Sequence, residues 1–232
     1  MAVMVVDRII APVYDTNCWI IAPSLGSECL IVDPGIDTPD LLPPILAMVA
    51  ARRLKPVAVL ITHGHIDHTF SLIPLSQVDG IATTYIHRAD RNLLADPMKG
   101  HGPQGLALLD QLAPGKKWRE PDRVEELVDG QRIEIAGMSV EAIHSPGHTE
   151  GSLMYRISND LLISGDVLFK GAIGRTDLPT GSPKKMDATL TNKVLTLPDN
   201  LRVLPGHGDE TEIGIEKITN PFLLSLNPGE RK

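Results

Sequence analysis

Residues 62–68 read Thr-His-Gly-His-Ile-Asp-His and follow directly on residues 57–61, Val-Ala-Val-Leu-Ile. The apolar run has the length and composition of a buried strand. Three imidazoles and a carboxylate therefore stand where a core strand ends. Core packing does not explain such a cluster, because unpaired polar groups at a buried strand end incur a large desolvation penalty. The segment predicts a metal site.

The spacing of these four donors indicates how they can meet. Alternate residues of an extended chain point to the same side. His63, His65 and Asp67 can therefore converge on one point, and His68 can reach a neighbouring point as the chain turns. Imidazole and carboxylate donors suit zinc, iron and manganese, and the segment contains no thiolate. One segment can thus serve two adjacent divalent ions, for which zinc is the first choice and iron or manganese the alternatives.

A metal shell needs donors from more than one segment, and three later donors follow predicted strands, each beside glycine. They are His148 in Ser-Pro-Gly-His-Thr, Asp166 in Ile-Ser-Gly-Asp and His207 in Leu-Pro-Gly-His-Gly. Glycine lets the backbone bend close to a site. The remaining histidines lack such a setting and are expected to be ordinary residues: His87, His101 and His144.

The regular elements are predicted from apolar patterning and from proline and glycine punctuation. The expected strands are residues 3–10, 17–22, 28–32, 57–61, 81–86, 123–128, 132–135, 139–143, 152–157, 161–163 and 201–204. The expected helices are residues 43–54, 70–77, 106–112, 184–197 and 211–218. Both halves run through strands, a helix and a strand that ends in a histidine motif. This order indicates two sheets packed face to face with helices outside.

Residues 96–121 differ from their surroundings because they are rich in proline and glycine. They predict a surface excursion, which is either a tolerated insertion or a lid over a site. The rest of the chain contains no linker that would divide it, so we expect a single domain over residues 1–232.

The overall composition excludes several classes of protein. The 232 residues are 42% hydrophobic and 22% charged, which is ordinary for a globular domain. The net charge of −7 and the lack of a long basic run argue against a nucleic-acid or membrane-surface partner. No signal peptide or membrane span is recognisable, and Cys18 and Cys29 are expected to be buried free thiols, so we expect a cytoplasmic protein. The oligomeric state is not predictable.

Taken in order, the four polar segments resemble the metallo-β-lactamase superfamily over residues 17–221. The resemblance implies an α+β fold, a four-layer αββα sandwich of two mixed sheets with helices on both outer faces and the site at one edge. Asp33, in an Asp-Pro-Gly turn, resembles the buried aspartate that the superfamily carries early in the chain. The turn-forming role of Asp-Pro-Gly is compatible with that assignment.

The resemblance also implies how the donors divide between two ions. The first ion would take His63, His65 and His148, the second Asp67, His68 and His207, with Asp166 as the bridge between them. Asp67 would in addition orient the attacking water, which makes it the candidate catalytic residue.

Residues 164–177 are most similar to the short hydrolases of the glyoxalase II type. The implied substrate is a thioester, an S-lactoyl or other acyl ester of a low-molecular-weight thiol. Arg175 is the first candidate for binding it and Lys170 the second, although Arg175 could instead pair with Asp177. Two departures leave the thiol open: only 25 residues follow His207, so we expect no C-terminal helical domain, and Asp209 stands where those enzymes carry a tyrosine.

The main alternative is a persulfide dioxygenase of the same superfamily, which shares a Gly-Arg-Thr-Asp loop much like residues 174–177. It would use a single Fe(II) on His63, His148 and Asp166. A β-lactamase, a nuclease, a flavo-diiron protein and a non-catalytic metal-binding module are less favoured. The acidic charge opposes the nuclease, and His65 stands where flavo-diiron proteins carry glutamate.

Overall fold

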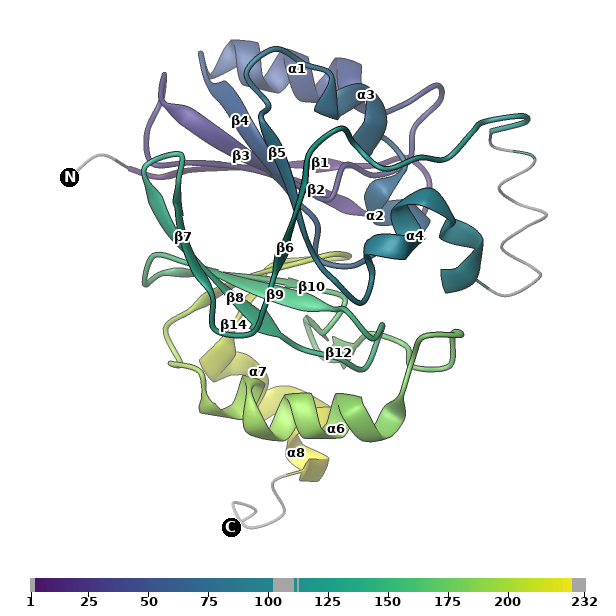
Figure 1. Cartoon of the computed structure of the whole chain (residues 1–232). Coiled ribbons are helices and arrows are strands. Elements are labelled where there is room, and N and C mark those ends of the chain that lie inside the picture. The colour runs from purple at the N-terminus through teal and green to yellow at the C-terminus, as the bar shows by residue number, and fades with distance from the viewer. Residues whose placement is uncertain (1–2, 102–110, 112, 227–232) are drawn as a thin grey trace.

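Two six-stranded β-sheets face each other in the computed structural model, which describes residues 3–101, 111 and 113–226 (Figure 1). The first sheet has the order β1-β2-β3-β4-β5-β6. Its strands are β1 (Val5–Ile10), β2 (Asn17–Ala22), β3 (Glu28–Val32), β4 (Lys55–Leu60), β5 (Thr83–His87) and β6 (Val124–Leu127). The first three strands are antiparallel, and β3 to β6 run parallel.

The second sheet is built from the second half of the chain, in the order β14-β13-β10-β9-β8-β7. Its strands are β7 (Arg132–Ile135), β8 (Met138–His144), β9 (Leu153–Ile157), β10 (Leu161–Gly165), β13 (Arg202–Pro205) and β14 (Thr211–Glu212). Only the pairing of β10 with β13 is parallel among these strands. A separate hairpin follows β10 and consists of β11 (Leu168–Phe169) and β12 (Ala172–Ile173).

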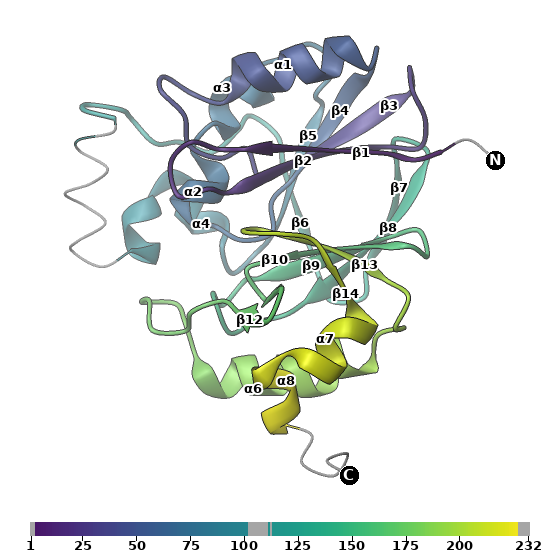
Figure 2. The ribbon, with the colours of Figure 1, turned by 180° about the vertical axis from the view of Figure 1, so that it is seen from behind.

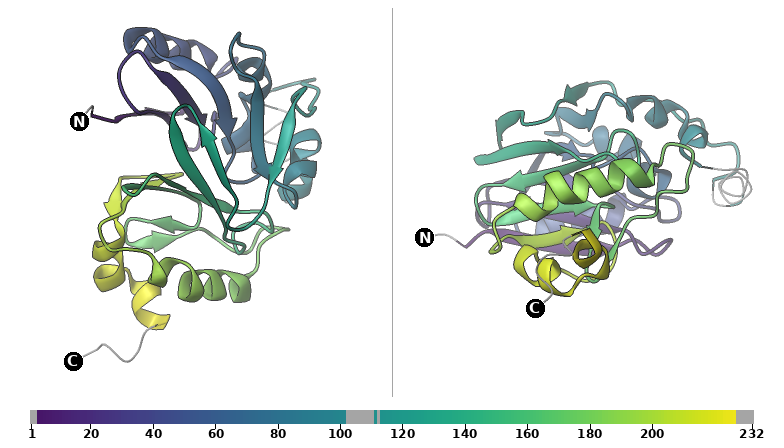
Figure 3. Two further views of the ribbon diagram at one scale, coloured as in Figure 1. Left: turned by 60° about the vertical axis from the view of Figure 1, so that its left-hand side comes forward. Right: turned by 90° about the horizontal axis from the view of Figure 1, so that it is seen from below.

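Helices cover the outer face of each sheet (Figures 2 and 3). On the first sheet lie α1 (Leu42–Ala51) and α3 (Leu72–Ser76), and on the second lie α6 (Pro183–Asn192), α7 (Ile213–Thr219) and α8 (Pro221–Leu226). Shorter helical turns are α2 (Ile66–Thr69), α4 (Arg91–Ala95), η1 (Pro97–Gly100) and η2 (Val194–Thr196). None of the helices in the described ranges combines the length and apolar character needed to cross a membrane.

The apolar pattern of the strands explains the layers. Every residue of β2 is buried, because one side of this strand faces the other sheet and the opposite side faces the helices. In β8, by contrast, Met138, Val140 and Ala142 are buried while the residues between them are partly exposed. The buried set belongs to a core cluster to which both sheets contribute. Two further clusters each lie between a sheet and the helices that cover it, one for the first sheet and one for the second.

The two sheets are also joined by hydrogen bonds where β4 ends. The amide of Leu153 on β9 donates to the carbonyl oxygen of Thr62 at 2.7 Å. The buried hydroxyl of Tyr155 donates to the carbonyl oxygen of Ile61 at 2.8 Å. These bonds place the first histidine segment directly against the second sheet.

The structure confirms the αββα sandwich. The two halves of the chain correspond to the two sheets except at β6, which follows the midpoint of the chain and pairs with β5 in the first sheet. Cys18 and Cys29 are buried free thiols. The predicted strands at 3–10 and 81–86 are slightly displaced in the structure, and the predicted helix at 211–218 begins with the short strand β14. Several elements were missed because they are too short for a periodic pattern: α2, α4, η1, β11, β12 and α8. The predicted helix at 106–112 falls largely outside the described residues, and the lid role of residues 96–121 stays a prediction.

Replacing Tyr155 with phenylalanine should destabilise the fold by about 1–3 kcal/mol, because the change leaves a buried carbonyl group without its donor. The free energy of unfolding of the metal-free protein in urea measures this. Tyr14→Phe is the matched control, since that tyrosine is half exposed and its loss of a hydroxyl should stay within about 0.5 kcal/mol. Equal stability of the two variants would contradict the cross-sheet role of Tyr155.

Candidate metal centre

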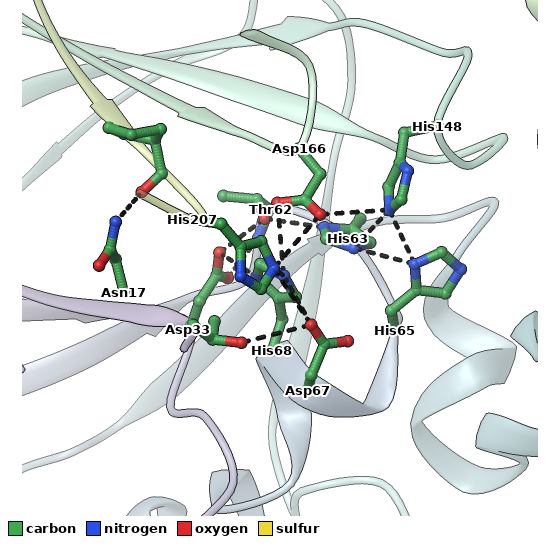
Figure 4. Close-up of polar contacts among 12 residues, drawn as sticks. Asn17, Asp33, Thr62, His63, His65, Asp67, His68, His148, Asp166 and His207 are labelled. Atoms are coloured by element: carbon green, nitrogen blue, oxygen red, sulfur yellow. Dashed lines mark hydrogen bonds and ion pairs between the residues drawn. The ribbon is translucent and has the colours of Figure 1, made fainter. Parts of the chain in front are cut away.

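The structure brings all seven predicted ligands together at one edge of the sandwich (Figure 4). They come from the segment after β4, the loop between β8 and β9, and the ends of β10 and β13. We call His63, His65 and His148 the first cluster, and Asp67, His68 and His207 the second cluster; the ligand atoms within each lie within 4.8 Å of one another. Asp166 lies between the two clusters.

Three ring nitrogens converge in the first cluster. His63 Nε2 lies 3.1 Å from His65 Nδ1 and 3.1 Å from His148 Nε2. His65 Nδ1 lies 2.8 Å from His148 Nε2. All three side chains are buried. The nitrogens therefore face one another in a volume too small for anything but a proton or an ion.

The outer hydrogen bonds of the first cluster decide which nitrogens carry protons. The hydroxyl of Thr62 donates to Asp33 Oδ2 at 2.7 Å and so accepts from His63 Nδ1 at 3.0 Å. His148 Nδ1 donates to the carbonyl oxygen of Arg175 at 2.8 Å. In the neutral rings Nε2 of both histidines is then a bare lone pair. These two lone pairs face each other and repel unless a cation lies between them.

In the second cluster, too, the outer ring nitrogens donate to protein oxygens and the inner nitrogens face one another. His68 Nδ1 donates to Asp33 Oδ2 at 2.9 Å, and His207 Nδ1 donates to the carbonyl oxygen of Tyr14 at 3.0 Å. Their Nε2 atoms lie 3.3 Å apart. Asp67 Oδ2 is 3.4 Å from the first of these atoms and 3.2 Å from the second. Two lone pairs and a carboxylate thus point at one position, which requires positive charge.

Asp166 reaches towards both clusters. Its Oδ2 lies 3.5 Å from His148 Nε2 and 3.5 Å from His207 Nε2. Its Oδ1 lies 3.4 Å from His68 Nε2, and this buried oxygen has no hydrogen-bond donor among the residues that the structure describes. A buried carboxylate oxygen without a donor is costly and marks a place for a cation. The carboxylate of Asp166 therefore lies within 3.5 Å of ligand nitrogens from both clusters.

The pKa values show how strongly the site demands positive charge. Burial and the neighbouring imidazoles hold the pKa of His63 and His65 well below the usual range, so both are neutral and able to bind a metal. Burial also acts to lower the pKa of His68, but the carboxylates around it, Asp67 foremost, raise that pKa well above its usual value. Without another cation, a proton therefore neutralises the carboxylates of the second cluster.

The donor set fits divalent ions of borderline softness. It consists of imidazole nitrogens and carboxylate oxygens, with no thiolate in either cluster. Such sets suit zinc, iron and manganese. The convergent lone pairs, the donorless oxygen of Asp166 and the raised pKa of His68 each call for a cation at the centre, so the residues present fit the metals that the sequence predicts.

Asp90 supports the centre and was missed by the sequence analysis. Its buried carboxylate accepts from the amide of Gly64 at 2.9 Å, the hydroxyl of Thr149 at 2.6 Å and the amide of Gly151 at 2.7 Å. It thereby joins the loop of His63 and His65 to the loop of His148. The available signal was its position just after a predicted strand, which it shares with the other acidic and histidine donors.

His101 was expected to be ordinary, but it lies against the first cluster. Its Nε2 accepts from the amide of Ile66 at 3.2 Å, and its ring centroid is 4.9 Å from that of His65. It therefore packs on the ligand side chain and belongs to neither cluster. His87 and His144 stack on each other, with centroids 4.0 Å apart, and take no part in either cluster.

The loop that carries His207 is held by the first sheet. Asn17 Nδ2 donates to the carbonyl oxygen of Pro205 at 3.0 Å and to that of Gly208 at 2.9 Å (Figure 4 shows the first bond). At Gly206 only glycine fits, because a Cβ atom there would overlap Asp166 Oδ1 and approach the ring of His68. The glycine of the Pro-Gly-His-Gly segment therefore keeps room for the bridging carboxylate.

The two predicted substrate-binding residues lie beside the centre and are paired with acids. The exposed guanidinium of Arg175 donates two hydrogen bonds to Asp177, both 2.8 Å long. Lys170 Nζ lies 3.7 Å from Asp209 Oδ2. The roles of Arg175 and Lys170 in substrate binding stay predictions.

The sequence profile of the Metallo-beta-lactamase superfamily matches residues 11–207, a span that contains all seven predicted ligands. The chain belongs to the metallo-β-lactamase superfamily. Members of this superfamily are generally metal-dependent hydrolases. The layers, the strand-end location of the site and its histidine-rich donor set are all accounted for by this membership.

The chain is similar to two relatives, of which one has a named activity and the other is uncharacterized. An uncharacterized protein of Mycobacterium tuberculosis is 43% identical over 218 residues, which cover 91% of this chain and 94% of the relative. The hydroxyacylglutathione hydrolase GloC of Haemophilus influenzae is 33% identical over 168 residues, which cover 72% of this chain and 76% of the relative.

Two solved structures are similar over nearly the whole chain. The BLEG-1 B3 metallo-beta-lactamase superposes with a TM-score of 0.79 at 31% identity, covering 94% of this chain and 99% of that one. TTHA1623, solved in a di-iron-bound form, superposes with a TM-score of 0.73 at 31% identity, covering 94% of this chain and 100% of that one.

Replacing Asp90 with asparagine should lower the affinity for metal by about tenfold or more, because the amide cannot accept all three hydrogen bonds that join the two ligand loops. Competition with a chromophoric chelator measures the affinity. Asp187→Asn, an exposed change on α6, is the matched control and should leave it unaltered. An unaltered affinity in the Asp90 variant would show that the loops hold their geometry without this carboxylate.

Proposed function

We propose that the protein is a binuclear metal-dependent thioester hydrolase of the glyoxalase II type, acting on an S-lactoyl or other acyl ester of a low-molecular-weight thiol. The observation that carries the proposal is the pair of cation-requiring clusters joined by Asp166. In this proposal His63, His65 and His148 would hold one ion, Asp67, His68 and His207 would hold the other, and Asp166 would serve both. The similarity to GloC supports the thioester as substrate.

The ions supply two things when bound: an acidified water and a Lewis acid for the thioester carbonyl. The side chains of the chain do the rest. Asp67 Oδ2 accepts from the hydroxyl of Thr16 at 3.3 Å and lies 3.2 Å from His207 Nε2. These contacts hold the carboxylate at the centre, where it orients the attacking water.

A thioester suits a site of this kind because its leaving group needs little help. A thiol has a reference pKa near 8.5, so it departs as a thiolate without a dedicated general acid. The two thiols of the chain lie buried in β2 and β3, and burial raises the pKa of each. Cys18 and Cys29 are therefore not nucleophiles, and the proposed reaction proceeds by direct attack of water.

The alternative of a mononuclear iron dioxygenase uses His63, His148 and Asp166 and leaves the second cluster without a task. The ligand atoms of the second cluster lie 3.2 to 3.4 Å apart, slightly further than those of the first, and its lone pairs require a cation on the same grounds. A di-iron-bound form of a 31% identical structure supports two ions in such a site. These observations favour the hydrolase.

The test is a substrate panel on metal-loaded protein purified without chelator. The panel contains acyl thioesters, a β-lactam and a persulfide with an oxygen electrode. We expect hydrolysis of S-lactoyl thioesters that is lost on chelation and restored by zinc, iron or manganese. Protein that binds two ions yet hydrolyses no thioester would contradict the proposal. One iron per chain with oxygen consumed on adding a persulfide would establish the alternative.

A further inference from the structure

Two exposed ion pairs flank the centre, one beside each cluster. The carbonyl oxygen of Arg175, whose guanidinium binds Asp177, accepts from His148 of the first cluster. Asp209, the partner of Lys170, lies two residues after His207 of the second cluster. The two predicted substrate-binding cations, Arg175 and Lys170, thus each have an acidic partner of the chain's own.

The pair on the side of the first cluster is the tighter one. Both hydrogen bonds from Arg175 to Asp177 are 2.8 Å long, so the planar guanidinium is matched to the carboxylate in a two-point contact. The partners are two residues apart in the sequence, so holding them together costs little chain entropy. The hydrogen bonds from Arg175 also lower the pKa of Asp177 to about 2, which keeps the carboxylate charged at every pH of interest.

The second pair stands where the centre is most open to solvent. The side chain of His207 is 26% exposed, while that of His68 is fully buried. Phe169 contacts this opening, with its ring centroid 6.0 Å from that of His207, and Lys170 follows it in the hairpin β11–β12. Tyr14, half exposed, holds His207 through its carbonyl group. The opening therefore has two aromatic residues beside it, and Lys170 is paired with Asp209.

We propose that Asp177 and Asp209 determine specificity: by occupying Arg175 and Lys170 they disfavour thiol carriers that bear carboxylates, and the enzyme acts preferentially on thioesters of uncharged thiols. This inference rests on the proposed thioester hydrolysis. A glutathione thioester carries two carboxylates, and each must displace an acid of the chain before it can pair with a cation. An uncharged carrier has no such competition and gains from contact with the aromatic opening.

The decisive comparison uses two substrates with the same acyl group, S-lactoylglutathione and S-lactoyl-N-acetylcysteamine. The readout is the ratio of their kcat/KM values, in which any general loss of activity cancels. The wild-type enzyme should prefer the uncharged thioester. Asp177→Asn and Asp209→Asn should each shift the ratio towards S-lactoylglutathione by about threefold, and the double variant by about tenfold, mainly through KM, as expected for releasing exposed cations.

Two controls separate local pairing from net charge. Asp199→Asn makes the same change in net charge and releases Lys217 from its ion pair. Asp199 precedes β13, whereas His207 follows the other end of that strand. This variant should leave the ratio unchanged. Adding Arg175→Gln to Asp177→Asn should return the ratio to the wild-type value, because it removes the released cation. The carbonyl group that holds His148 is retained in that variant.

The outcomes distinguish this inference from the function on which it rests. A wild-type preference for S-lactoylglutathione, or a ratio that neither Asp177→Asn nor Asp209→Asn alters, would overturn the specificity and leave thioester hydrolysis standing. Hydrolysis of neither thioester by protein with two bound ions would contradict the proposed function and the specificity together.

Discussion

Bare imidazole nitrogens facing one another are the constraint on which this centre depends. The outer nitrogen of each of four histidines donates a hydrogen bond to a protein oxygen. These oxygens belong to Thr62, Asp33, Arg175 and Tyr14, and Thr62 is oriented as an acceptor by its own bond to Asp33. In the neutral rings the inner nitrogens carry no proton, and they lie about 3 Å apart. Facing lone pairs repel each other in a buried site. The arrangement becomes favourable only when cations lie between the nitrogens, so these hydrogen bonds create a site that requires metal ions.

The ligand side chains lie together because several strands of the sandwich end at the same edge. The segments after β4, β10 and β13 and the loop between β8 and β9 meet there, although they are far apart in the chain. The bonds from Leu153 and Tyr155 to the end of β4 fix the two sheets at the same point. Asp90 then ties together two of the loops. Rigid strands thus position the ligands, and the hydrogen bonds between loops hold their orientation.

Much of the site could be predicted because its donors follow strands. The alternation of an extended chain aligned His63, His65 and Asp67, and glycine marked the later donors. The layers followed from the resemblance of these motifs. Asp90 and His101 were missed, because their roles depend on which loops pack together; the position of Asp90 after a strand was the only signal, and a lone histidine has no periodic signature. The pairing of Arg175 was left open for the same reason: a sequence shows that Asp177 is near, but not which partner the guanidinium takes.

The charge of the surroundings complements that of the centre. Beside the centre, Asp177 and Asp209 pair with Arg175 and Lys170, so these two cations are balanced by acids of the chain. Metal titration of the chelator-stripped wild-type protein measures whether the centre requires two cations. Calorimetry with zinc should saturate at two ions per chain, with elemental analysis in agreement. Saturation at one ion, or no binding at all, would contradict the account.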